Sequence, residues 1–147
     1  MLIVIAMCAE RGYYVSFGDV ENAYQQSPPP TIQCFLEIDD AIYDWYLNRF
    51  KVKLDRFKDV IPLYRALQGH PEAGVLWERM ITDILVNKMG FKHTAHERNI
   101  YTGEIDGETV LVCRQVDDFA SGSPTLATAE RFIELLREHV RCEFADM

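Results

Sequence analysis

The sequence predicts an α+β fold, a mostly antiparallel sheet with helices packed on one face. Two observations carry this prediction. Short apolar stretches bounded by turn residues indicate strands near residues 14–19, 108–115 and 119–122. Two longer stretches with apolar residues at i, i+3 and i+4 spacing indicate helices over residues 71–89 and 125–140.

Length and charge limit the classes of function. The 147 residues, 48% of them hydrophobic, suffice for one domain over residues 1–147 with a sizeable core. The formal net charge is -8, with 15 Lys and Arg against 23 Asp and Glu. Because phosphate contacts draw on clustered cations, this balance argues against a free-standing nucleic-acid-binding domain.

The N-terminal stretch predicts a helix over residues 2–10 that stops before Gly12. MLIVIAMCA has no basic region before it, so it does not resemble a signal peptide. No apolar run approaches the length of about 20 residues that a membrane span requires. The cysteines form no CxxC pair, which favours a reduced, intracellular compartment; they are Cys8, Cys34, Cys113 and Cys142.

Short elements are expected in the next part of the chain. Residues 14–17 alternate as a strand that ends at Asp19. The three prolines in residues 27–30 require a loop, because proline supplies no hydrogen-bond donor to a ladder. A second strand is expected over residues 33–38.

Two helices follow. Asp39 and Asp40 precede an amphipathic stretch, residues 41–47, and are best explained as helix caps. PEAGVLWERMITDILVNKMG predicts a long helix with Pro71 at its first position and Gly90 at its end. Its expected buried stripe comprises Leu76, Trp77, Met80, Ile81, Ile84 and Leu85.

The C-terminal third predicts a hairpin and a last helix. A short strand near residues 100–101 precedes the hairpin, whose tip is residues 116–118. The last helix is expected to take Ser123 as its N-cap and Pro124 as its first residue. Its predicted buried residues are Leu126, Phe132, Ile133, Leu136 and Val140.

The stretch CRQVDDFASG sets Asp117 and Asp118 side by side among apolar residues. Unpaired carboxylates near a core are costly unless they are solvated or neutralised. The residues alone leave two interpretations open, a solvated turn and a metal-binding turn. A third carboxylate, Asp19, ends a neighbouring strand and favours the second, because three carboxylates can hold two Mg²⁺ ions for phosphoryl or nucleotidyl transfer.

Four stretches resemble successive blocks of the reverse transcriptase of Ty1/copia-type retrotransposons, in the family's order. They are DVENAY (19–24), LQGHPEAGVLW (67–77), MGFKHTAHERNIY (89–101) and QVDD (115–118). Each block is weak alone, but four in order are specific. The resemblance covers most of the chain and implies a polymerase-palm-like sheet with RNA-directed DNA polymerase activity.

The resemblance also implies roles for individual residues. Asp19, Asp117 and Asp118 would be catalytic and, with the Val20 carbonyl, would hold two Mg²⁺ ions, for which Mn²⁺ could substitute. Tyr24 matches the aromatic residue that closes under the deoxyribose and excludes a 2′-hydroxyl. Packing at a strand end is the alternative role for Tyr24.

Three further residues are implied in substrate binding. Gln68 and Gly69 correspond to the segment that approaches the incoming nucleotide and the template, although a surface turn would also explain Gln68. Gln115 stands at the position that touches the primer end. Tyr is common in the family at the positions of Gln68 and Gln115, and these departures leave the metal ligands intact but put primer placement in question.

The resemblance implies a palm fragment that lacks complete fingers and thumb and is incomplete on its own. Its partners would be an RNA or DNA template with primer, deoxynucleoside triphosphates, and the rest of a Pol polyprotein with integrase and ribonuclease H, in the cytoplasm or in virus-like particles. Two alternatives stay open. One is an inactive retroelement remnant or binding domain without catalysis, and the other is a nucleotide cyclase, which the lack of a glycine-rich phosphate-binding signature disfavours.

Overall fold

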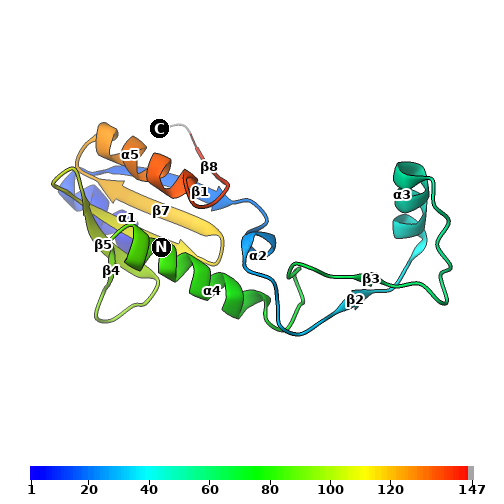
Figure 1. Cartoon of the computed structure of the whole chain (residues 1–147). Coiled ribbons are helices and arrows are strands. Elements are labelled where there is room, and N and C mark those ends of the chain that lie inside the picture. The colour runs from blue at the N-terminus through cyan, green and yellow to red at the C-terminus, as the bar shows by residue number, and fades with distance from the viewer. Residues whose placement is uncertain (146–147) are drawn as a thin grey trace.

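A computed structural model describes residues 1–145 and is built around a six-stranded antiparallel sheet (Figure 1). The strand order is β4-β5-β6-β7-β1-β8. The strands are β1 (Tyr14–Val20), β4 (Lys92–His93), β5 (Ile100–Ile105), β6 (Glu108–Gln115), β7 (Asp118–Ser123) and β8 (Cys142–Phe144). The α+β class is confirmed, as are the three strands predicted near Asp19 and the hairpin.

Helices cover both faces of this sheet. On one face lie α4 (Ala73–Asp83), the π-helical turn η1 (Ile84–Lys88) that continues it, and α5 (Leu126–Arg137), as predicted (Figure 1). On the other face α1 (Leu2–Arg11) packs against β1, β6 and β7. The expectation of helices on one face only is therefore wrong, because β6 is buried at five consecutive residues, Val110 to Arg114, and needs cover on both sides.

The hydrophobic core consists of two clusters, one on each face of the sheet. The larger cluster joins α4 and α5 to the sheet and includes Trp77, Ile81, Phe132, Leu136, Val112 and Phe119. The smaller cluster joins Val4 and Cys8 of α1 to Leu111 and Cys113 of β6. Gly122 permits the close approach of α1, because a Cβ built there would lie 2.1 Å from the Cys8 Sγ.

The long helix α4 begins at Ala73, two residues later than predicted. Pro71 lies in the preceding turn, where the His70 carbonyl accepts a hydrogen bond from the Ala73 amide at 3.1 Å. The Glu72 carboxylate accepts from the Ile32 amide at 2.7 Å and from the Thr31 hydroxyl, so contacts with a distant segment hold this turn out of the helix. Gly90, with φ 76°, follows the helix as predicted.

The last helix also begins later than predicted. Its N-cap is Thr125, whose hydroxyl accepts from the Thr128 amide at 3.3 Å, whereas Ser123 is the final residue of β7. Leu126, predicted to be buried, is 41% exposed. The other predicted core positions of this helix are buried.

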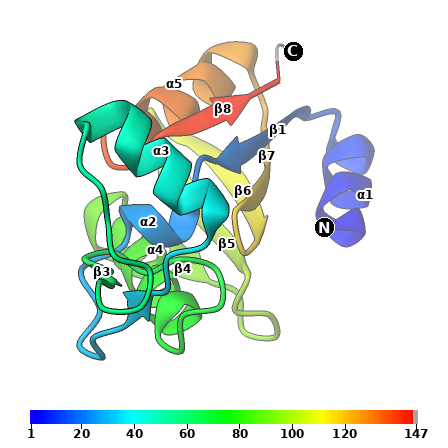
Figure 2. The ribbon, with the colours of Figure 1, turned by 90° about the vertical axis from the view of Figure 1, so that its right-hand side faces the viewer.

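Between β1 and α4 the chain leaves the sheet as an arm, residues 28–66 (Figures 1 and 2). In the arm β2 (Phe35–Leu36) pairs with β3 (Ile61–Pro62), and α3 (Asp40–Phe50) lies at the far end. The strand predicted over residues 33–38 is thus reduced to two residues outside the main sheet.

Two further local findings complete the fold. The Asp39 carboxylate accepts from the Ile42 amide at 2.8 Å, which confirms that this acid caps α3. A short helix, α2 (Ala23–Gln26), follows β1 and was not predicted. None of the helices within residues 1–145 is long and apolar enough to cross a membrane.

Candidate functional site

The strand register brings the predicted acids to one end of the sheet. Asp19 of β1 lies directly opposite Asp118 of β7, and Asp118 lies opposite Gln115 of β6. On the outer side of β1, Asp19 also faces Glu143 of β8. Directly opposed residues of antiparallel strands project from the same face, so these four residues form one row across four strands, hereafter the acidic row.

The acidic row lies on the sheet face away from α4 and α5. Val20 and Phe119, which follow Asp19 and Asp118, are buried in the larger core cluster. Because side chains alternate across the pleat, the two acids project from the opposite face. Both are exposed to solvent, as a site that receives a substrate requires.

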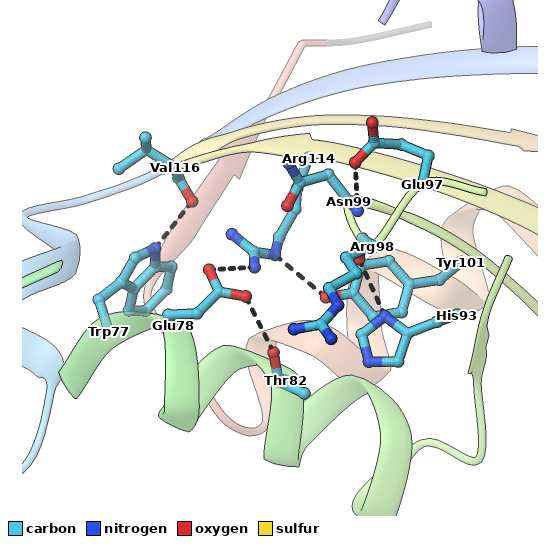
Figure 3. A network of polar contacts seen from close by, with 10 residues as sticks. All are labelled: Trp77, Glu78, Thr82, His93, Glu97, Arg98, Asn99, Tyr101, Arg114 and Val116. Atoms are coloured by element: carbon cyan, nitrogen blue, oxygen red, sulfur yellow. Dashed lines mark hydrogen bonds and ion pairs between the residues drawn. The ribbon is translucent and has the colours of Figure 1, made fainter. Parts of the chain in front are cut away.

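The tip of the hairpin is a two-residue turn, Val116 and Asp117, so Asp118 belongs to the strand and not to the tip as predicted. Val116 has φ 59°, which is unfavourable for a β-branched residue. Two hydrogen bonds hold the turn. The Trp77 indole N–H donates to the Val116 carbonyl at 2.8 Å (Figure 3). The Val20 amide donates to the Asp117 carbonyl at 3.0 Å.

A buried cation braces the same hairpin two residues before Val116. Arg114 is 2% exposed and forms an ion pair with Glu78, the neighbour of Trp77 on α4 (Figure 3). Its Nε lies 3.4 Å from the Tyr101 hydroxyl on β5. Trp77 and Glu78, which are consecutive residues of α4, therefore contact the Val116 carbonyl at the tip and strand β6 that leads into it.

A pocket of about 440 Å³ lies beside the tip, hereafter the Tyr24 pocket. Its lining residues are Asn22, Ala23, Tyr24, Gln25, Gln68, Val116 and Asp117. It thus brings together Tyr24 at the start of α2, Gln68 from the loop before α4, and Asp117 from the hairpin. Gly69, beside Gln68, has φ 93°, a backbone conformation that favours glycine.

The row of like charges perturbs Asp19. Partial desolvation of the carboxylate raises the pKa of Asp19 above its ordinary value, and the negative charges of Asp117, Asp118, Glu143 and Glu21 raise it further, in that order. No cation partner of Asp19 is found among residues 1–145. A divalent cation would relieve this repulsion.

The side chains themselves do not converge. Within residues 1–145, no group of three or more His, Cys, Asp or Glu is placed to hold a metal ion. The backbone nevertheless sets Asp19 and Asp118 opposite each other, with Asp117 next in the chain. Exposed aspartates can change χ1 rotamer, and oxygen donors suit Mg²⁺, so these residues fit a divalent cation by register and by donor chemistry.

Two contributors to the site were missed from sequence. Glu143 lies on β8, a strand too short to be predicted, and its place in the acidic row follows only from pairing with β1. Trp77 was assigned to the core, where it indeed lies, but its hydrogen bond to the tip was not foreseen. A buried indole N–H usually has a hydrogen-bond partner, so the predicted burial of Trp77 was the signal that could have indicated this contact.

Comparison with protein-family models, with curated proteins and with solved structures gave no match.

Proposed function

We propose that this chain is the palm of a copia-like reverse transcriptase, an RNA-directed DNA polymerase that performs two-metal nucleotidyl transfer. The single observation that supports this most is the pairing of Asp19 with Asp118 across β1 and β7, with Asp117 at the adjoining tip. A polymerase-palm-like sheet needs acids from two neighbouring strands at one end. Two of the four resemblance blocks, DVENAY and QVDD, contain these three acids, and the register pairs Asp19 with Asp118.

In this proposal Asp19, Asp117 and Asp118, with the Val20 carbonyl, would hold two Mg²⁺ ions. The chemistry supplied by bound ions would be activation of an attacking 3′-hydroxyl and stabilisation of the leaving oxygen in a displacement at phosphorus. The chain contributes the position of the carboxylates. Trp77 and Val20 hold the tip backbone, and the strand pairing fixes Asp19 against Asp118.

The Tyr24 pocket is the proposed site for the sugar and base of the incoming deoxynucleotide. Tyr24 would close under the deoxyribose and leave no room for a 2′-hydroxyl, while Gln68 and Gly69 would approach the nucleotide and the template. Gln115, exposed in the acidic row, would hydrogen-bond the primer end. Tyr24 and Gln68 line the same pocket as Asp117, which supports a shared ligand.

The partners in this proposal are a primed RNA or DNA template, deoxynucleoside triphosphates and the remaining parts of a Pol polyprotein, in an intracellular setting. Fingers and thumb would hold the triphosphate and duplex in line, and positioning supplies much of the rate of phosphoryl transfer. The isolated chain is therefore expected to show negligible primer extension.

A second candidate is a palm that has lost catalysis and serves as a binding domain. One observation favours it, namely that no ligand group within residues 1–145 is assembled for a metal. The intact acid triad and the register favour the first candidate.

Primer extension in a longer context tests the proposal. The chain, joined to upstream fingers and a downstream thumb, should extend a DNA primer on an RNA template with Mg²⁺. Asp117→Asn should abolish extension without loss of fold, whereas Asp83→Asn on the exposed side of α4 should not. An inactive wild type that binds metal normally would favour the second candidate.

A further inference from the structure

A polar pocket lies between α4 with η1 and the end of β4 with the β4–β5 connection, residues 94–99. Its volume is about 720 Å³, and it is hereafter the arginine pocket. Because α4 covers the sheet face opposite to the acidic row, this pocket is separate from the candidate metal site. Pockets of this size accommodate a small organic molecule.

Two arginines line the pocket from its two sides, Arg79 on α4 and Arg98 on the β4–β5 connection. Both are exposed, and Figure 3 shows Arg98 projecting from the connection toward α4. Within residues 1–145 neither guanidinium forms an ion pair or a hydrogen bond. Since a guanidinium fork matches the oxygens of phosphate, each is available to an anionic group of a ligand.

Two acids also line the pocket, but other side chains hold both of them. Glu78 forms its ion pair with the buried Arg114, and its second oxygen accepts from the Thr82 hydroxyl at 3.3 Å (Figure 3). Asp83 accepts from the Asn87 amide at 2.7 Å. The lining together with Arg114 carries three arginines against two acids, a local positive charge in a chain whose net charge is -8.

The pocket also offers hydrogen-bond acceptors. The His93 Nδ1 lies 2.9 Å from the Arg98 carbonyl, and because a carbonyl can only accept, Nδ1 donates and the Nε2 of the neutral ring is an acceptor. The Asn87 side-chain oxygen accepts no hydrogen bond from any of residues 1–145. Acceptors of this kind suit the hydroxyl groups of a ligand.

The backbone that carries Arg98 is held by several hydrogen bonds. The Thr94 hydroxyl donates to the Glu97 carbonyl at 2.8 Å, and the Asn99 amide donates to the Glu97 carboxylate at 3.1 Å. The Arg114 amide in turn donates to the Asn99 carbonyl at 3.0 Å. A site whose backbone is already ordered loses less entropy when a ligand binds.

We infer that the arginine pocket binds a small phosphorylated sugar or polyol. Arg79 and Arg98 contact the phosphate, whose double charge two guanidinium groups match better than a single carboxylate would. His93 and Asn87 accept hydrogen bonds from the hydroxyls. The binding needs no metal and takes place on the other face of the sheet, so it goes beyond the proposed function.

Calorimetry on the whole chain in EDTA tests this inference with glucose 6-phosphate as the probe. Inorganic phosphate, phenyl phosphate and glucose each present only part of its chemistry. We expect glucose 6-phosphate to bind at one site and about tenfold more tightly than any of the three. Backbone amide NMR shifts should appear at Arg79, Asn87 and Arg98 and not at Asp19 or Asp118.

Charge variants test the phosphate contacts. Arg79→Gln and Arg98→Gln should each weaken the binding of glucose 6-phosphate about tenfold. The matched control for the double variant is Arg49→Gln/Arg141→Gln, which removes the same charge at two exposed arginines outside the pocket and should bind as wild type. Circular dichroism melts of all variants check that the fold is retained.

Several results would overturn the inference. They are the absence of glucose 6-phosphate binding, equal losses in the arginine double variant and its control, and NMR shifts confined to the acidic row. Equal affinity for glucose 6-phosphate, phenyl phosphate and inorganic phosphate would make the pocket a site for free phosphate and reject the sugar. Displacement of glucose 6-phosphate by (dT)12 at equal phosphate concentration would instead indicate a nucleic-acid surface.

Discussion

At the scale of single residues, the main feature of the site is that strand pairing holds several negatively charged side chains next to one another. Asp19 faces Asp118 on one side and Glu143 on the other, and partial desolvation together with these charges raises the pKa of Asp19. An acid whose pKa is raised in the folded state stabilises the fold while it is protonated. This contribution is present below the unfolded pKa, near 4, and is lost as pH rises through the raised folded pKa.

Asp19→Asn should therefore become more stable relative to wild type as pH rises from about 3 to 7 in metal-free buffer. Urea denaturation at several pH values measures the difference in the free energy of unfolding. Asp44→Asn, an exposed substitution on α3, is the control and should show no such trend. A difference that stays constant or shrinks with pH would contradict the electrostatic account of the row.

Tyr24 has a predicted effect on substrate selection. In a chain with fingers and thumb, Tyr24→Ala should increase the relative incorporation of ribonucleotides by one to two orders of magnitude, because the ring no longer blocks the 2′-hydroxyl. Tyr24→Phe keeps the ring and should preserve discrimination. Equal discrimination by the Ala and Phe variants would indicate that Tyr24 is only a packing residue.

At the scale of elements, the hairpin is a two-residue turn held in an unfavourable conformation. Val116 at φ 59° costs about 1–3 kcal/mol relative to an unstrained residue, and such strain persists only where neighbours hold it. The sequence predicted the hairpin itself, because apolar strands flank the acids. It could not give the turn conformation, because valine is a poor indicator of a positive φ.

Val116→Gly should relieve this strain and raise the free energy of unfolding by about 1 kcal/mol. Val60→Gly, at a similarly exposed valine in the arm without a positive φ, should not stabilise the chain. Chemical denaturation of both variants measures the contrast. Destabilisation by Val116→Gly would show that the valine side chain contributes more than the strain removes.

Trp77 links α4 to the tip and should act on the metal site from a distance. Trp77→Phe removes the donor to the Val116 carbonyl and should lower the free energy of unfolding by about 1–3 kcal/mol. It should also weaken Mn²⁺ binding severalfold, measured by calorimetry. Tyr101→Phe, which alters the Arg114 network away from the tip, should leave Mn²⁺ affinity unchanged.

At the scale of the whole molecule, periodicity predicted the elements that are long or strongly patterned. The strands at β1, β6 and β7 and the helices α1, α4 and α5 followed from it. The starts of α4 and α5 did not, because a distant segment holds Glu72 outside α4 and because Thr125 caps α5 in place of Ser123. The elements β3, β4 and β8 each have two or three residues, too few for a pattern.

The candidate site was likewise only partly predictable from the sequence. Asp19, Asp117 and Asp118 could be named from sequence because strand ends and a hairpin were predictable. Glu143 could not, because it joins the row only through the pairing of β8 with β1. The arm likewise emerged only in three dimensions, where α3 lies away from the sheet (Figure 1).

Metal binding tests the central claim most directly. Mn²⁺ titrated into the isolated chain and followed by calorimetry and melting temperature should bind with a stoichiometry of up to two and raise the melting temperature. Asp117→Asn/Asp118→Asn should lose both effects. Asp39→Asn/Asp40→Asn removes the same charge from the other adjacent pair, retains a capping side chain, and should bind as wild type. No Mn²⁺-dependent shift in the wild type, or the same shift in both double variants, would contradict a metal site at this hairpin.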